Sequence, residues 1–224
     1  MKTIDVIILT NTANGWYHNL LSECIRSIKL NTNINTNIIV VESNLKLVHK
    51  TIEDYEMPIN VLLSPNEPFN FNRFLNYGIK ASTSEYICLS NNDVIYDPNC
   101  FGELVKGLDS YDSVSPWEPT MSWNFHSKQE NHEGYITRSH ITGWCICIKR
   151  STIEKIGLLD ENFSFWYADD DYAKTLETNG LKHALIGKAE AVHLIEKSHG
   201  LIPYDKREEK TINQGKVYDK KWKK

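Results

Sequence analysis

The sequence predicts an α/β protein with a mostly parallel central sheet and helices on both of its faces. Short apolar runs alternate with stretches of helical periodicity through the first half of the chain, a pattern typical of such sheets. The 224 residues suffice for one domain with a buried core, and the hydrophobic fraction of 41% excludes a disordered chain. No apolar run is long enough to span a bilayer, so we expect no stable insertion into a membrane.

The first half of the chain contains four predicted strands, at residues 5–10, 37–42, 59–63 and 86–89. Each is a short apolar run that ends in polar residues. Helices are predicted between them at residues 17–30, 46–55 and 69–81, where apolar residues recur at helical spacing. Ligands of parallel sheets bind beyond the carboxyl ends of the strands, so the polar residues there are the first candidates for a binding site. They are Thr10, Asn11, Glu42, Asn44, Asn91, Asn92 and Asp93.

The second half is less regular. Residues 116–140 are polar with scattered aromatic side chains and little periodicity, which predicts a long loop with a functional role. The remaining predicted elements are a strand at 143–149, a short helix at 151–156 capped by Ser151, a helix at 169–178 that ends at Asn179-Gly180, strands at 182–186 and 191–195, and a charged tail at 201–224.

The composition limits the class of protein. A formal net charge of −4 at pH 7 argues against an obligate nucleic-acid scaffold, which needs a basic excess. The five cysteines are odd in number and scattered, and no second pair accompanies Cys145 and Cys147 to complete a zinc site. We therefore expect reduced thiols and a cytoplasmic protein. The glycine motifs of dinucleotide-binding folds and P-loops, and the G-x-S-x-G motif of hydrolases, are absent.

A candidate metal site follows the strand predicted at residues 86–89. The segment LSNNDV brings Asn91, Asn92 and Asp93 to the carboxyl end of that strand. One carboxylate together with phosphate oxygens from a nucleotide suffices to hold Mg²⁺ or Mn²⁺. His193, in EAVHLIE, is a second candidate ligand through its neutral imidazole. The structural alternatives are an ordinary β-turn at residues 91–93 and a core histidine with one satisfied hydrogen bond.

Three consecutive carboxylates, Asp169, Asp170 and Asp171, follow an aromatic cluster and begin a predicted helix. A carboxylate there could act as a general base toward a bound hydroxyl. Acids in a first helical turn also complement the helix dipole, which is the structural alternative. One or two acids suffice for that purpose, and three neighbours repel one another, which favours a functional role for at least one of them.

In their order and spacing these segments resemble the family 2 glycosyltransferases, which have the Rossmann-like GT-A fold. The resemblance covers residues 3–193. VIILTNTANGWYHNLLSECIRSI is similar to the opening strand and helix of the family, and VVESN to its nucleobase-binding segment. PNEPFNFNRFLNYGIKASTSEYICLSNNDV resembles the central block, and GWCICIKRSTIEKIGLLDENFSFWYADDDY the most specific one, because many fixed spacings coincide in it. VHLIEKSHG and the closing KKW also resemble family segments.

The resemblance implies a role for each matching residue. Asp93 would be the metal-binding acid of a D-x-D-type motif in which Asn91 replaces the first Asp, and His193 would complete the metal shell. Asp169 would be the catalytic base, although the assignment could fall on Asp170 or Asp171. The residues implied for the donor and the sugar pocket are Thr10, Asn11, Glu42 at the uracil, Asn44, Arg73 at the ribose or phosphates, Asn76, Asn91, Asn92, Trp144 and Trp166. Plain core packing is the alternative for Trp144.

The implied activity is transfer of a sugar from a nucleotide-sugar donor, expected to be a UDP-sugar, to an acceptor hydroxyl with inversion and with Mn²⁺ or Mg²⁺. Residues 1–95 would form the nucleotide-binding half of a single domain, residues 96–200 the acceptor half, and residues 201–224 a tail. A catalytically inactive nucleotide-sugar-binding module is the alternative, because Asn91 and Ala168 replace acids of the family.

The acceptor stays open at this point. A saccharide, a lipid-linked glycan and a protein are all compatible with the sequence. Residues 216–224 hold five lysines, so a modified DNA base is another candidate acceptor, as in a phage-type enzyme working in the host cytoplasm. A solvated tail without a polyanionic partner is the alternative interpretation of these lysines.

Overall fold

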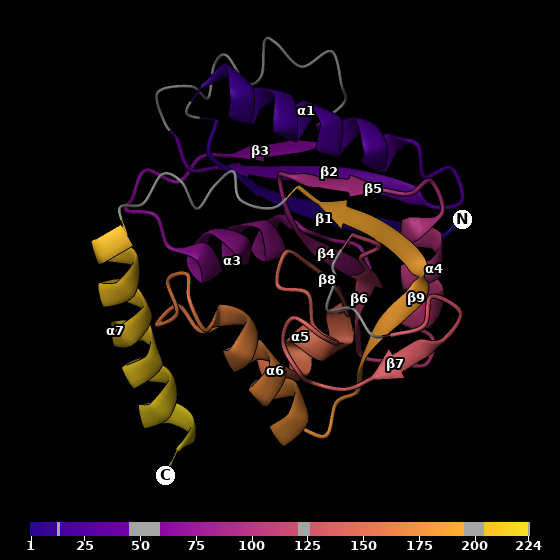
Figure 1. Ribbon diagram of the computed structural model, residues 1–224. Coiled ribbons are helices and arrows are strands. Elements are labelled where there is room, and N and C mark those ends of the chain that lie inside the picture. Colours follow the sequence, from indigo (N-terminus) through magenta and orange to yellow (C-terminus); the bar gives the residue numbers. More distant parts are fainter. Residues whose placement is uncertain (13, 45–58, 121–125, 195–203, 224) are drawn as a thin grey trace.

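The computed structural model describes residues 1–12, 14–44, 59–120, 126–194 and 204–223 (Figure 1). The strands are β1 (Thr3–Thr10), β2 (Asn35–Glu42), β3 (Val61–Leu63), β4 (Tyr86–Asn91), β5 (Val94–Tyr96), β6 (Ser113–Trp117), β7 (Asn131–Glu133), β8 (Cys145–Lys149) and β9 (His183–His193). The helices are α1 (Gly15–Lys29), α3 (Phe71–Ala81), α4 (Cys100–Gly107), α5 (Arg150–Ile156), α6 (Ala168–Thr178) and α7 (Tyr204–Trp222).

The strands form one sheet in the order β3-β2-β1-β4-β8-β6-β9-β5, with β7 paired to β9 beside this path. Parallel pairs join β3, β2, β1 and β4, and β6 is parallel to β9. The strand β8 runs antiparallel between β4 and β6, and β5 and β7 run antiparallel to β9. The predicted mostly parallel sheet is therefore confirmed, and the strands that run antiparallel to their neighbours, β5, β7 and β8, all follow β4 in the chain.

Helices cover both faces of this sheet, as predicted. Because side chains alternate along a strand, β1 contributes to two cores. Val6 and Ile8 pack with residues of α1 and α4, whereas Ile7 and Leu9 pack with α3, α5 and α6. In Figure 1, α1 lies on one side of the strands, and α3, α5 and α6 lie on the other. A side chain at Gly78 of α3 would meet Ile7 at 2.3 Å, so this glycine allows α3 to approach β1 closely.

Most predicted elements of the first half are confirmed. The apolar face of α1 is buried as expected, and the helix starts where the Asn14 side chain accepts hydrogen bonds from the amides of Trp16 and Tyr17. The helix predicted at residues 46–55 lies outside the described residues. In the second half, α6 ends at Asn179 as predicted, with Gly180 at a φ of +63°.

Several predictions for the second half are wrong. The two strands predicted at residues 182–186 and 191–195 join into one strand, β9, which continues through Gly187, and residue 195 lies outside the described residues. A side chain at Gly187 would lie 2.3 Å from the carbonyl oxygen of Glu130. Ser151 does not cap α5, which begins one residue earlier and has no side-chain cap. The region 116–140 is not a continuous loop, since it contains the end of β6 and the three-residue β7. These segments are too short for periodicity to register.

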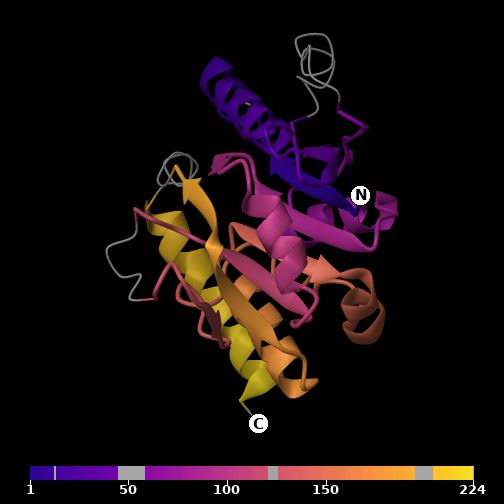
Figure 2. The ribbon, with the colours of Figure 1, turned by 90° about the vertical axis from the view of Figure 1, so that its right-hand side faces the viewer.

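The charged C-terminal segment forms the helix α7, which lies beside α6 (Figures 1 and 2). Its described lysines differ in exposure. Lys216, Lys220 and Lys223 are exposed, and Lys223 is 2.9 Å from Asp219. Lys221 is partly buried and is ion-paired with Asp160 and Asp171, so the prediction of a solvated tail does not hold for this lysine.

All five cysteines are free thiols buried in the core, in agreement with the expected reduced state. The sulfur atoms of Cys88, Cys145 and Cys147 lie within 4.8 Å of one another where β4 pairs with β8. Among the described helices, none combines the length and apolar character that crossing a bilayer requires.

Candidate active site

The two predicted metal ligands meet at the ends of two paired strands. Asp93 follows β4 by two residues and immediately precedes β5, and His193 is the last residue of β9. The antiparallel register pairs Val94 with His193, which brings Asp93 Oδ1 within 3.1 Å of His193 Nε2. Asp93 is 4% exposed. A carboxylate and an imidazole held this close form a donor set that suits Mn²⁺ or another divalent cation, so the residues fit the expected group.

Two further residues hold His193 in place. The indole of Trp144 is stacked on the imidazole, with the ring centroids 5.3 Å apart and an interplanar angle of 12°. The carboxylate of Glu118, which is 2% exposed, accepts the backbone N–H of His193 at 3.1 Å. The sequence analysis missed Glu118, because a single acid after a short strand in an aperiodic region carries no pattern. Trp144 also belongs to the buried core, so its predicted role in the sugar pocket stays a prediction.

The segment Gly143-Trp144 lies between the Asp93–His193 pair and the first turn of α6, which carries the three consecutive aspartates. The backbone N–H of Asn91 donates to the carbonyl of Trp144 at 2.9 Å, which fixes the segment to the end of β4. On its other side, a Cβ atom at Gly143 would lie 3.0 Å from Asp169 Oδ2. Asp169 therefore rests against Gly143, while the next residue, Trp144, contacts His193. The residues predicted as metal ligands and as catalytic base thus line one continuous stretch of the structure.

The three consecutive carboxylates differ in their partners. Asp170 Oδ1 accepts a hydrogen bond from Thr137 Oγ1 at 2.8 Å. Asp171 is 4% exposed and accepts the indole N–H of Trp222 at 2.7 Å. Asp169 accepts only the backbone N–H of Asp170, at 3.1 Å, among the hydrogen bonds found for its side chain in the described part of the chain. Neither Asp169 nor Asp170 is paired with a cationic side chain among the described residues, whereas Asp171 is paired with Lys221.

Burial raises the pKa of Asp169 above the usual range for a carboxyl group, and the charge of the adjacent Asp170 raises it further. The pKa of Asp171 is also raised by burial, although Lys221 and Trp222 counteract this effect through hydrogen bonds. A carboxylate with a raised pKa is a stronger proton acceptor than an exposed one, which suits Asp169 for general-base chemistry.

The residues predicted to surround the nucleobase form a hydrogen-bonded group at the ends of β1 and β2. The Glu42 carboxylate accepts hydrogen bonds from the Thr12 hydroxyl at 2.6 Å and from the backbone N–H of Asn44 at 2.7 Å. The Asn92 amide donates to Thr10 Oγ1 at 2.9 Å, which ties β1 to the metal-ligand turn. The side-chain Nδ2 of Asn44 donates to the side-chain Oδ1 of Asn11 at 3.4 Å.

Glu42 is fully buried, and burial raises the pKa of its carboxyl group. Its oxygens already have protein partners. That Glu42 contacts the uracil stays a prediction; in the structure its carboxylate accepts hydrogen bonds from Thr12 and Asn44. The sequence analysis did not include Thr12.

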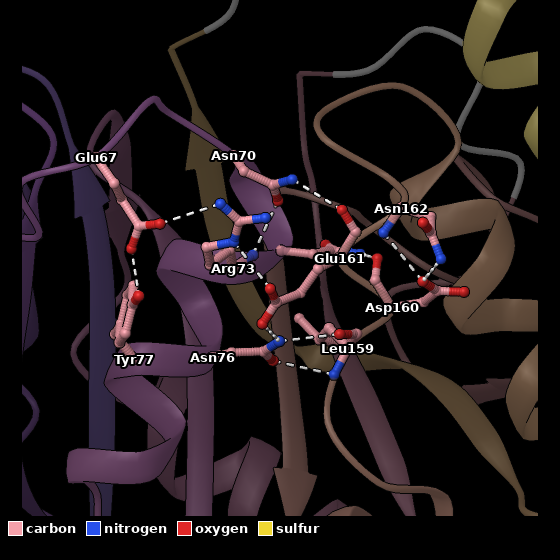
Figure 3. Close-up of polar contacts among 10 residues, drawn as sticks. Glu67, Asn70, Arg73, Asn76, Tyr77, Leu159, Asp160, Glu161 and Asn162 are labelled. Atoms are coloured by element: carbon pink, nitrogen blue, oxygen red, sulfur yellow. Dashed lines mark hydrogen bonds and ion pairs between the residues drawn. The ribbon is translucent and has the colours of Figure 1, made fainter.

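Arg73 and Asn76 occupy a separate network between α3 and residues 159–162 (Figure 3). Asn76 is 1% exposed; its amide donates to the Leu159 carbonyl at 2.9 Å and accepts the Leu159 N–H at 3.0 Å. Arg73 is paired with Glu161 at 2.8 Å and Glu67 at 3.0 Å. That these two residues contact the donor stays a prediction; in the structure both of them hold the loop that leads to α6.

Trp166 belongs to that same loop. Its ring contacts Phe165 at a centroid distance of 4.1 Å, and Phe165 in turn contacts Phe71 at the start of α3. Trp166 thus lies two residues before the first turn of α6, close in sequence to Asp169, and remains half-buried. Its predicted role in the sugar pocket is compatible with this position.

The fold is that of a GT-A glycosyltransferase. A family model described as glycosyl transferase family 2 matches residues 6–157, which is most of the chain. The chain belongs to this family. No curated protein sequence matches the chain significantly.

Two solved structures illustrate the fold. The mannosyltransferase PcManGT from Pyrobaculum calidifontis, in complex with GDP-Man and Mn²⁺, is 17% identical at a TM-score of 0.67, with 87% of this chain and 57% of that chain covered. GalNAc-T7 with UDP, GalNAc and Mn²⁺ is 13% identical at a TM-score of 0.67, with 85% and 43% covered. The chain therefore spans about half the length of these two proteins, and the likeness concerns the fold.

Proposed function

We propose that this chain transfers a sugar from a nucleotide-sugar donor, with a UDP-sugar as the first candidate, to an acceptor hydroxyl with inversion at the anomeric carbon. The observation that carries the proposal is the Gly143-Trp144 segment, which touches Asp169 on one side and His193 on the other. Glycosyl transfer needs a proton acceptor beside the acceptor hydroxyl and a positive charge beside the departing phosphate. Asp169 and the Asp93–His193 pair, on either side of this segment, are suited to these two tasks. The family membership supports the same reaction class.

Asp93 and His193 are the residues that would hold the divalent cation, Mn²⁺ or Mg²⁺. When bound there, a cation supplies Lewis-acid stabilisation of the negative charge on the departing diphosphate. Glu118 and Trp144 keep His193 oriented toward Asp93 through its backbone N–H and its ring face. Groups that orient a metal ligand without binding the metal themselves affect the metal affinity of the site.

Asp169 is the proposed general base. Its carboxylate takes the proton of the acceptor hydroxyl while the acceptor oxygen forms a bond to the anomeric carbon. The bond between that carbon and the phosphate oxygen breaks in the same step, and its electron pair leaves with the nucleoside diphosphate. A carboxylate whose pKa is raised by burial is suited to this task, because it binds the proton more tightly in the course of the reaction.

The choice of donor is open to direct measurement. PcManGT was solved with GDP-Man and GalNAc-T7 with UDP and GalNAc, so both nucleotide classes occur among proteins of this fold. We expect thermal stabilisation by the true donor in the presence of Mn²⁺, because a ligand that binds only the folded state raises its apparent stability. UDP-, GDP- and TDP-sugars would be screened for this shift, and the donor that gives it would then be incubated with Mn²⁺ to measure nucleoside diphosphate release.

The same assay tests the alternative of an inactive binding module. A module would show the metal-dependent thermal shift but release no nucleoside diphosphate, with or without acceptors. For the acceptor, candidate saccharides and hydroxymethylated DNA would be compared with the identified donor. Since Lys221 is already ion-paired in the structure, we give saccharide acceptors priority over DNA.

A further inference from the structure

The helix α7 contacts residues 160–171, which comprise the end of the loop after α5 and the first turn of α6 with its three aspartates. Trp222 Nε1 donates to Asp171 Oδ1 at 2.7 Å, and Lys221 Nζ lies 2.8 Å from the same oxygen. Lys221 Nζ is also 2.8 Å from Asp160 Oδ2. One lysine thus bridges the beginning of the segment, at residue 160, and its end in the first turn of α6.

A second group of contacts holds the middle of the segment. Gln214 Oε1 accepts the backbone N–H of Ser164 at 2.7 Å, and Gln214 Nε2 donates to the carbonyl of Asn162 at 3.1 Å. The ring of Tyr218 faces that of Tyr167 at a centroid distance of 5.5 Å. These contacts are to backbone groups and to the residue that precedes α6, so they fix the path of the chain as well as its side chains.

Tyr167 has an unusual backbone conformation. Its φ is +59°, in the left-handed region that residues other than glycine rarely adopt, and it occupies the N-cap position of α6 without a side-chain cap. The neighbouring contacts from α7, including the close approach of Gly215 to the Tyr167 hydroxyl, support this conformation from outside. The direction in which α6 begins therefore depends on α7.

Helix geometry links the α7 contact to Asp169. Successive residues of an α-helix are rotated by about 100°, so Asp169 and Asp171 point in directions about 200° apart. Asp171 faces α7, and Asp169 faces Gly143. A rotation of the first turn that released Asp171 from Trp222 would move Asp169 away from Gly143 at the same time.

We propose that α7 sets the position of the catalytic carboxylate, with Lys221 and Trp222 as positioning residues that act on Asp169 through Asp171. This inference rests on the proposed function for the identity of the base. It gives the three consecutive carboxylates separate tasks: Asp169 accepts the proton, Asp170 holds Thr137, and Asp171 anchors the helix. A displacement of about 1 Å in a reacting group can cost about 10²-fold in rate, so a loosened anchor should be visible in turnover.

The test compares four single variants in the full chain. Lys221→Met removes the bridging charge, Trp222→Phe removes the indole N–H but keeps a ring, and Lys221→Arg restores a charged donor. Lys223→Met is the matched control, because it removes the same charge from the same helix at a residue paired with Asp219. Release of nucleoside diphosphate from UDP-glucose and GDP-mannose with Mn²⁺ is measured per folded molecule, together with hydrogen exchange of the amides in residues 164–171.

We expect kcat of Lys221→Met to fall about 10- to 100-fold while KM for the donor changes less than about threefold, because placement is lost and donor binding is kept. Trp222→Phe should lose less, Lys221→Arg should recover part of the rate, and Lys223→Met should match the wild type. Faster amide exchange in residues 164–171 should accompany the loss in Lys221→Met and be absent in Lys223→Met.

An unchanged kcat in Lys221→Met overturns the proposal, even if exchange becomes faster, because the anchor would then be structural only. If the wild-type chain releases no nucleoside diphosphate from either donor, the proposed activity on those donors fails on its own. In that case the exchange comparison still decides whether α7 orders the start of α6: equal exchange in Lys221→Met and Lys223→Met overturns the coupling.

Discussion

The indole of Trp144 lies parallel to the imidazole of His193, with ring centroids 5.3 Å apart. Because Trp144 is only 8% exposed, its ring gives His193 a fixed plane on which to rest. Replacing an outer residue that orients a metal ligand usually lowers metal affinity about 10- to 100-fold. We predict a loss of this size in Mn²⁺ affinity for Trp144→Leu, measured by calorimetry with the nucleoside diphosphate present. Trp144→Phe keeps an aromatic face and should lose less; equal losses in both variants would contradict the stacking argument.

Asp169→Asn should separate chemistry from binding. A general base contributes typically about 10²- to 10⁴-fold in rate, so we predict a fall in kcat of that order. Donor affinity, measured by calorimetry with Mn²⁺, should stay near the wild-type value because the carboxylate does not contact Asp93 or His193. Near-normal turnover in this variant would show that another group accepts the proton.

Asp93→Asn should have the opposite profile. The carboxylate at the end of β4 is the proposed anionic ligand of the cation, and the cation in turn binds the donor phosphates. We therefore predict that the variant loses the Mn²⁺-dependent thermal shift with a nucleoside diphosphate. A thermal scan with and without Mn²⁺ measures this directly, and the melting temperature without either ligand serves as the control for folding. A preserved Mn²⁺-dependent shift would place the cation elsewhere.

The pH dependence of turnover should respond to Asp170. The charge of Asp170 contributes to the raised pKa of Asp169, after the larger effect of burial. A base works only when deprotonated, so the acidic limb of the pH–rate profile follows this pKa. Asp170→Asn removes the neighbouring charge but keeps an oxygen that can accept from Thr137. We predict that its acidic limb moves to lower pH; no movement, or movement to higher pH, would argue against Asp169 as the titrating group.

Acid stability should depend on His183. This residue is fully buried between Ser113, whose Oγ is 2.9 Å from Nδ1, and the carbonyl of His140, and burial lowers its pKa to about 3. Between this value and the ordinary pKa of about 6.5, the unfolded chain binds a proton that the folded chain does not. His183 thus contributes a loss of stability of about 1.4 kcal/mol per pH unit as the pH falls through that window. Denaturant titrations at pH 7 and pH 5 should give a smaller difference for His183→Gln than for the wild type.

The sequence predicted the parallel half of the sheet well because its strands are buried on both faces and appear as continuous apolar runs. It also predicted Asp93 and His193 as candidate ligands of one cation, from their places near predicted strand ends and from the family resemblance. It could not predict how the three consecutive aspartates at residues 169–171 differ in their partners. The hydrogen bonds that distinguish them come from Trp222 and Thr137, which are distant in the chain. The partners of Arg73 and Asn76 in the structure were not predictable for the same reason: they include the loop at residues 159–162, which no local pattern connects to α3.

The burial of all five cysteines has a practical consequence for spectroscopy. None of the five native cysteine thiols is exposed to a labelling reagent while the chain stays folded. A cysteine introduced on the outer face of α7, for example at the exposed Asn213, would then be the sole reactive position and could carry a fluorophore without removing any native residue. The fluorescence of a probe there would report the docking of α7 over time. The slow rate at which the buried native thiols react would separately measure global unfolding.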